Sequence, residues 1–131
     1  MYRLTKELVL KILLSIGALF FIFEFFLHFF GLPILEHDKI FLFTHDRYIG
    51  IFGLTYGVLL ILIATDIRKY KHLFIITMLG ILLSMANAYY ISRVGGYVQF
   101  GVQSLNQDLS TLGLGAALWY VLTSVLWWRI K

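Results

Sequence analysis

The sequence predicts an all-α integral membrane protein, a four-helix bundle with both termini in the cytoplasm. Of its 131 residues, 60% are hydrophobic and 18% are aromatic, and the mean hydropathy is +0.86, far from the composition of soluble domains. The apolar residues form four long runs joined by short polar connections. Because four spans use nearly every residue, we expect one transmembrane domain over residues 1–131 and no soluble catalytic domain.

The longest apolar run predicts a first span at about residues 6–32. About 20 helical residues, each rising about 1.5 Å, cross a hydrocarbon core of about 30 Å. Gly31 and Pro33 end this helix, because proline cannot continue the hydrogen-bond ladder. The run is too long for the apolar part of a secretory signal, and no small-residue cleavage pattern follows it, so we expect a retained span.

The second span is predicted at about residues 45–65. Gly53 and Gly57 form a G-x-x-x-G pair, and Gly50 lies on the same face. Glycines at this spacing let two helix backbones approach closely. We therefore expect the tightest packing of the bundle along these three glycines.

The third and fourth spans are predicted at about residues 73–92 and 110–128. Each repeats the spacing of small residues that favours close helix packing. The pairs are Gly80 with Ser84 and Gly113 with Ala117. Residues 93–109, between these spans, contain Gly and Gln and are predicted to form a connection.

The distribution of positive charge predicts the orientation. Lysines and arginines are enriched on the cytoplasmic side of membrane proteins. Eight lie on the side of the termini and three on the other, so we expect a multi-pass protein of the cell membrane with both termini inside. The eight are Arg3, Lys6, Lys11, Arg68, Lys69, Lys71, Arg129 and Lys131, and the three are Lys39, Arg47 and Arg93.

Charge and composition exclude several classes of function. The net charge of +4 would suggest a nucleic-acid partner in a soluble protein, but here the basic residues flank apolar runs, so we expect none. The chain has no cysteine, which excludes disulfides, thiolate metal sites and redox cysteine pairs. It has no phosphate-binding glycine loop and no G-x-S-x-G or H-E-x-x-H motif, which favours a non-enzyme.

Polar residues gather toward the outer side of the predicted topology. Glu24 and His28 lie four residues apart in the outer half of the first span, so they share a helix face, and each would be costly if turned toward lipid. This side is where we expect a site, if the chain has one. The other polar residues placed there include His37, His45, Arg47, Asn87 and Arg93.

A structural role is one interpretation of these residues. Glu24 would pair with Arg47, Arg93 or His28 and so fix the register of the helices, and Asn87 would add an amide inside the third span. A second interpretation is a metal site. Carboxylate and imidazole ligands suit zinc, copper or iron, and they would come from Glu24, His28, His37 and His45.

A third interpretation makes Glu24 a proton or cation carrier, because a carboxylate beside an imidazole at membrane depth can bind and release protons. No matching acid lies in the other spans. The inner half offers only a few hydroxyl side chains, so a complete conduction path is not evident. These are Ser15, Thr77, Thr123 and Ser124.

Several short segments between residues 47 and 96 resemble the small four-helix membrane proteins grouped as DoxX-like. They are Arg47-Tyr48-Ile49-Gly50-Ile51-Phe52-Gly53, Tyr56-Gly57, the basic turn from Asp66 to Lys69, and Leu79-Gly80 to Ser84. The resemblance implies a four-helix bundle from a family in which some members accompany membrane oxidoreductases. Glu24 and His28 have no match in that pattern, so no site residue is carried over.

We therefore expect a non-catalytic accessory subunit of a larger membrane complex, with a respiratory or oxygenase-type enzyme as one candidate. Its partners would be the lipid bilayer and other integral membrane subunits. The alternative is a small protein that binds a metal ion, a proton or a lipophilic ligand at its outer end through Glu24 and His28.

Overall fold

The computed structural model describes residues 5–34, 43–93 and 105–130. These residues form four helices and no strand, which confirms the all-α part of the prediction for the described chain. The helices are α1 (Lys6–Phe30), α2 (Phe43–Thr65), α3 (Lys71–Arg93) and α4 (Leu105–Trp128).

The ends of α1 follow from its sequence. Thr5 caps the N-terminus, where its hydroxyl accepts a hydrogen bond from the Leu8 N–H at 3.3 Å. At the other end Gly31 adopts a left-handed conformation with φ 66°, and its N–H donates to the carbonyl of Leu27. A residue with a side chain rarely adopts this conformation, so the glycine closes the helix before Pro33.

Helix α4 begins earlier than expected, at Leu105 instead of residue 110. Asn106, Gln107 and Asp108 made this stretch look like part of a connection. Such polar side chains are also favourable in the first turn of a helix, where N–H groups are unpaired and the helix dipole attracts negative charge. Residues 105–109 therefore belong to the start of α4, and their predicted place in the connection is wrong.

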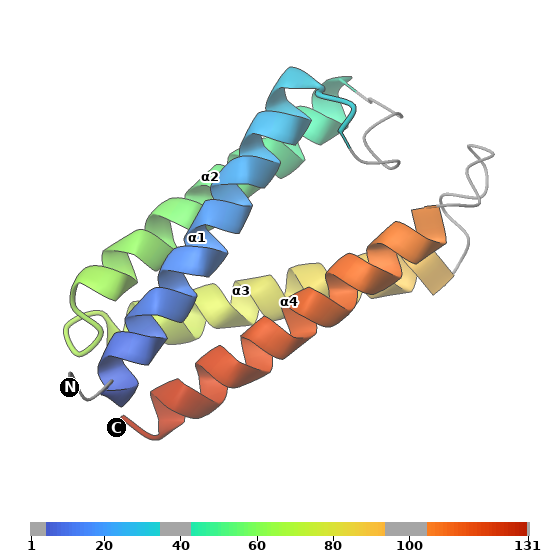
Figure 1. Cartoon of the computed structure of the whole chain (residues 1–131). Coiled ribbons are helices and arrows are strands. Elements are labelled where there is room, and N and C mark those ends of the chain that lie inside the picture. Colours follow the sequence, from blue (N-terminus) through green and yellow to red (C-terminus); the bar gives the residue numbers. More distant parts are fainter. Residues whose placement is uncertain (1–4, 35–42, 94–104, 131) are drawn as a thin grey trace.

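The four helices form two antiparallel hairpins arranged as a V (Figure 1). Helices α1 and α2 make one arm, and α3 and α4 make the other. The arms meet at the end that holds both termini and the turn between α2 and α3, which we call the joined end. They separate toward the opposite end, which we call the open end.

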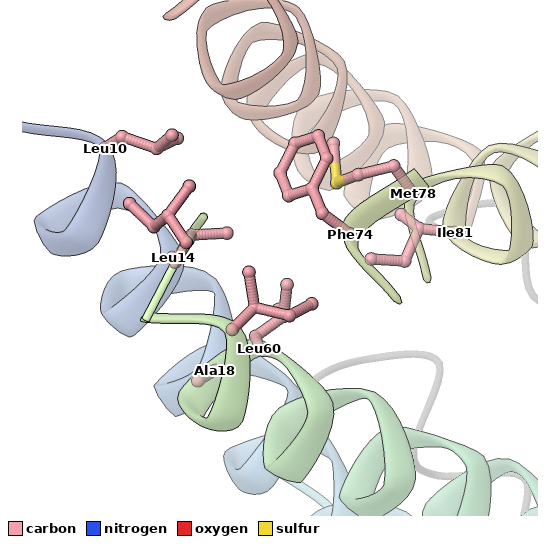
Figure 2. Close-up of a cluster of buried hydrophobic side chains, with 9 residues drawn as sticks. Leu10, Leu14, Ala18, Leu60, Phe74, Met78 and Ile81 are labelled. Atoms are coloured by element: carbon pink, nitrogen blue, oxygen red, sulfur yellow. The ribbon is translucent and has the colours of Figure 1, made fainter. Parts of the chain in front are cut away.

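The buried core lies near the joined end. Side chains from α1, α2 and α3 point toward one another there, as Figure 2 shows. Phe74 of α3 also stacks on Trp127 of α4, with ring centroids 4.9 Å apart. Packing at one end therefore holds the two arms together. The core residues are Leu10, Leu14, Ala18, Leu60, Ile63, Ile67, Phe74, Met78 and Ile81.

The α1–α2 arm has the most extensive helix contact in the described chain, and it runs along the three glycines of α2. A Cβ added to Gly53 would lie 2.9 Å from the carbonyl oxygen of Phe21, and one added to Gly50 would lie 3.0 Å from the amide nitrogen of Phe29. The two backbones are therefore in direct contact, which a larger residue at these positions would prevent.

The other small residues differ in what they contact. A Cβ on Gly80 would meet the Tyr56 hydroxyl at 2.7 Å, whereas one on Gly113 would meet nothing within 4 Å. The Ser84 hydroxyl donates to the Gly80 carbonyl of its own helix at 3.0 Å, and Ala117 is half-buried. Gly113 thus makes no close helix contact, because α4 lies in the other arm and approaches α1 farther along its length.

Helix α4 contacts α1 through a tryptophan. The Trp119 indole N–H donates to the carbonyl oxygen of Leu13 at 2.7 Å. Its ring covers Gly17 so closely that a Cβ there would collide with it. The contact gives the indole its polar partner and fixes where the two arms meet.

Among the described residues, two helices are long and apolar enough to cross a bilayer, Lys6–Phe30 with a mean hydropathy of 2.3 and Asp46–Thr65 with 2.0. In the other arm the described residues contain shorter apolar segments, Lys71–Asn87 and Gly113–Trp128.

We predict opposite effects for two glycine substitutions. Gly53→Ala should lower the free energy of unfolding by about 1–3 kcal/mol, because its methyl group would press on the α1 backbone. Gly113→Ala has open space and should raise it by about 0.5–1 kcal/mol through helix propensity alone. Thermal unfolding of the two purified variants, followed by circular dichroism, measures both effects. Equal shifts in the two variants would contradict the close α1–α2 contact.

Candidate functional site

Three ionisable side chains meet at the open end of the α1–α2 arm. His28 lies between Glu24 and Asp46, with Nε2 at 3.1 Å from Glu24 Oε2 and Nδ1 at 3.1 Å from Asp46 Oδ1. Their side chains are largely buried, with exposed fractions of 11% for His28, 16% for Glu24 and 13% for Asp46. We call this cluster the acid–histidine triad.

Two features of the sequence place the triad. Glu24 and His28 are one helical turn apart on α1, so their side chains lie side by side. Asp46 lies one turn before Gly50, and Gly50 packs against the backbone of Phe29, the neighbour of His28. The close approach at this glycine therefore brings the Asp46 carboxylate within reach of the imidazole.

Asp46 also lies in the first turn of α2, where the positive end of the helix dipole favours a carboxylate. The position thus suits Asp46 both as a residue of the helix start and as a partner of His28. The local sequence indicated only the first of these two roles, the place of Asp46 at the start of the helix.

The hydrogen bonds restrict where protons can be. An ionised carboxylate only accepts hydrogen bonds, so with both acids ionised each ring nitrogen of His28 must donate, and the ring is then an imidazolium. The triad would carry a net charge of −1 in that state. The same contacts also fit a neutral ring that accepts a hydrogen bond from a protonated carboxyl group. The triad can therefore hold a proton on the ring or on an acid.

Metal binding is a poorer match to this geometry. Within residues 5–34, 43–93 and 105–130, no group of three His, Asp or Glu side chains is arranged to hold a metal ion. A ligating imidazole offers one nitrogen to the metal, whereas both nitrogens of His28 face carboxylates. His37 lies outside the described residues, and the backbone of His45 is described in α2 but its side chain is not.

Arg47 does not pair with Glu24, although that pairing was one expected alternative. Its guanidinium carbon lies 3.9 Å from the centre of the Phe43 ring and 5.1 Å from that of Phe29. Among the described residues its buried Nε has no hydrogen-bond partner. Of the three partners proposed for Glu24, the structure shows His28.

The remaining predicted partners lie elsewhere. Asn87 is on α3, in the other arm, and its side chain is exposed. The side chain of Arg93 lies outside the described part of the chain, although its backbone ends α3. Neither is brought to the triad by the described structure.

The joined end offers no continuation of the triad. Of the side chains described there, the buried polar ones are Thr77 and Thr123, and the Thr123 hydroxyl donates to the carbonyl of Trp119 in its own helix. Ser15 is exposed and donates to the Lys11 carbonyl. The apolar core thus separates the triad from this end, and the described residues form no polar path through the molecule.

A cavity of about 290 Å³ lies where the two arms meet, between α1 and α4. Its walls are almost entirely apolar, and the Trp119 ring forms one side. The lining residues are Ile16, Gly17, Phe20, Phe21, Gly115, Ala116 and Trp119. One signal for it is visible in the sequence, the small residues Gly17, Gly115 and Ala116 in otherwise bulky helices.

Comparison of the chain with protein-family models, with curated proteins and with solved structures finds no significant match.

We predict that His28 and Asp46 are energetically coupled across the two helices. In a double-mutant cycle of His28→Ala and Asp46→Ala, the coupling free energy should be about 0.5–3 kcal/mol, since the contact is largely buried. Denaturant unfolding of the four proteins measures it. The control cycle uses the more exposed pair Glu7 and Lys11, at 3.8 Å, where effects should add to within about 0.5 kcal/mol. Additive effects at positions 28 and 46 would contradict the triad.

Proposed function

We propose that this chain is a multi-pass membrane protein that acts as a non-catalytic accessory subunit of a larger membrane complex. The observation that carries the proposal is the distribution of apolar surface. Large apolar side chains are exposed on all four helices, while the hydrophobic core cluster lies near the joined end. Such a surface suits lipid and the apolar faces of other membrane subunits.

The proposal that the chain spans a membrane rests on α1 and α2. Only 22% of the most apolar stretch of α1 and 28% of that of α2 are buried within the chain. A helix this apolar in a soluble protein would be covered by the rest of its domain. Helices α3 and α4 would provide two further spans, and the excess of Lys and Arg near the termini supports a cytoplasmic joined end.

An accessory role is supported by how the polar groups are used. Glu24, His28 and Asp46 bind one another, and the cavity is lined by apolar side chains. The triad then fixes the register of α1 on α2, a known use of buried polar pairs. The DoxX-like resemblance of residues 47–96 belongs to the same proposal, with an oxidoreductase as one candidate partner.

The α3–α4 arm supplies the surface for a partner subunit. It packs on the first arm near the joined end and separates from it toward the open end (Figure 1). Its apolar side chains toward the open end are exposed. These residues include Leu82, Leu83, Tyr89, Tyr90, Leu114 and Leu118.

We predict that the tagged chain stays in the membrane pellet after alkaline carbonate washing and co-purifies in mild detergent with a stoichiometric membrane partner. Leu114→Asn with Leu118→Asn should reduce capture of that partner by more than half while leaving the chain in the membrane, because both side chains are exposed. Blue native electrophoresis and mass spectrometry of the captured material measure this. A monodisperse chain that captures no partner from native membranes would refute the accessory role.

A second candidate function is the binding of a lipophilic ligand, and the cavity between α1 and α4 favours it. An apolar cavity of about 150 Å³ holds a benzene ring, so the cavity here is large enough for a ring or a short length of hydrocarbon chain. This location differs from the expected site at Glu24 and His28. The triad is instead suited to holding a proton.

We predict that Ala116→Leu, which fills the cavity, removes any lipophilic compound that co-purifies with the chain. Ala117→Leu changes a neighbouring position that does not line the cavity and should retain it. Mass spectrometry of organic extracts from the two variants and the wild type measures the bound compound. Equal retention in all three proteins would exclude the cavity as the binding site.

A further inference from the structure

Arg47 is a half-buried cation whose buried Nε has no hydrogen-bond partner among the described residues. A guanidinium has five N–H donors, and the one on the buried Nε finds no acceptor among the described residues. The Phe29 and Phe43 rings stabilise its charge through their faces, but this leaves the donors at the guanidinium edge unused. A buried donor without a partner is costly, so Arg47 requires an acceptor from outside the described chain.

The two acids described at this end of the arm are already bound. Glu24 and Asp46 both contact His28, at 3.1 Å each. The triad therefore satisfies the carboxylates with an imidazole and leaves the guanidinium available, although Asp46 is the direct sequence neighbour of Arg47. A ligand for Arg47 need not displace a carboxylate.

The surroundings indicate which anion would reach Arg47. It lies near the start of α2, at the open end, where Phe30, Phe43 and Tyr48 are each about 60% exposed. If the chain spans a membrane, as proposed above, these three exposed aromatic side chains lie at the level of the lipid headgroups. Phosphate is the anion found at that level.

We propose that Arg47 binds the phosphate group of a membrane lipid at the open end of the α1–α2 arm. The planar guanidinium donates two parallel hydrogen bonds to phosphate oxygens, a geometry that lysine cannot reproduce. Phe29 and Phe43 hold the guanidinium in place. The acyl chains of the lipid lie along the exposed phenylalanines of α1, which include Phe23, Phe26 and Phe30.

The experiment measures the thermal unfolding of delipidated full-length protein in an uncharged detergent. Three additives are titrated: dioleoyl phosphatidylglycerol, the matching diacylglycerol without phosphate, and inorganic phosphate. Phosphatidylglycerol should raise the midpoint temperature of thermal unfolding of the wild-type protein by several degrees, because a ligand that binds the folded state stabilises it. Diacylglycerol should have a smaller effect. Equal stabilisation by inorganic phosphate would support the phosphate contact and identify free phosphate as the source.

Variants assign the effect to Arg47. Arg47→Gln should weaken the apparent affinity for phosphatidylglycerol about tenfold, which corresponds to about one charge-assisted hydrogen bond. Arg47→Lys, which keeps the charge without the planar fork, should be intermediate and tests the proposal if the glutamine variant does not fold. Arg68→Gln is the matched control, because Arg68 lies at the joined end with its side chain 80% exposed. This variant should bind phosphatidylglycerol as tightly as the wild type does.

Two results would overturn the proposal: an Arg47→Gln or Arg47→Lys variant that binds phosphatidylglycerol as tightly as the wild type, or stabilisation by diacylglycerol equal to that by phosphatidylglycerol. Carbonate washing reports separately on the proposed membrane location. A chain that stays in the membrane while Arg47→Gln binds normally would refute this inference alone.

Discussion

The close approach of α1 and α2 is the constraint on which the rest of the structure depends. Gly50, Gly53 and Gly57 have no side chains to separate the helices, so the backbone of α2 lies against that of α1. At this distance van der Waals contact is continuous along the arm. It also fixes the register of the two helices, because a shift along the axis would place a bulky side chain where a glycine now lies.

That register decides how the charged groups are used. It brings Asp46 to His28, which already contacts Glu24 within α1. One imidazole thereby satisfies two carboxylates that would be costly to bury alone. It also separates Arg47 from both acids and leaves it between two aromatic rings. The triad and the contact of the guanidinium with two phenylalanine rings are thus two results of the same helix contact.

The two ends of the molecule differ in the same physical terms. Near the joined end, apolar side chains from both arms interlock, and the Trp119 indole bonds to the α1 backbone. At the open end the arms separate and their apolar side chains are exposed (Figure 1). Packing within the chain therefore joins the two arms at one end only. In the proposed membrane setting, lipid or partner subunits would cover the other end and would give Arg47 access to a headgroup.

The sequence by itself determined that the chain is helical and that Glu24 and His28 share a helix face, with His28 as one of three alternative partners for Glu24. Apolar runs bounded by glycine, proline and charged turns define helices, and residues four apart on a helix are neighbours whatever the tertiary structure. Only the tertiary structure decided that Asp46 completes the triad, that Arg47 lies on phenylalanine rings and that Trp119 covers Gly17. Contacts between helices depend on register and crossing, which arise from the packing of many side chains and leave no periodic signal in the sequence.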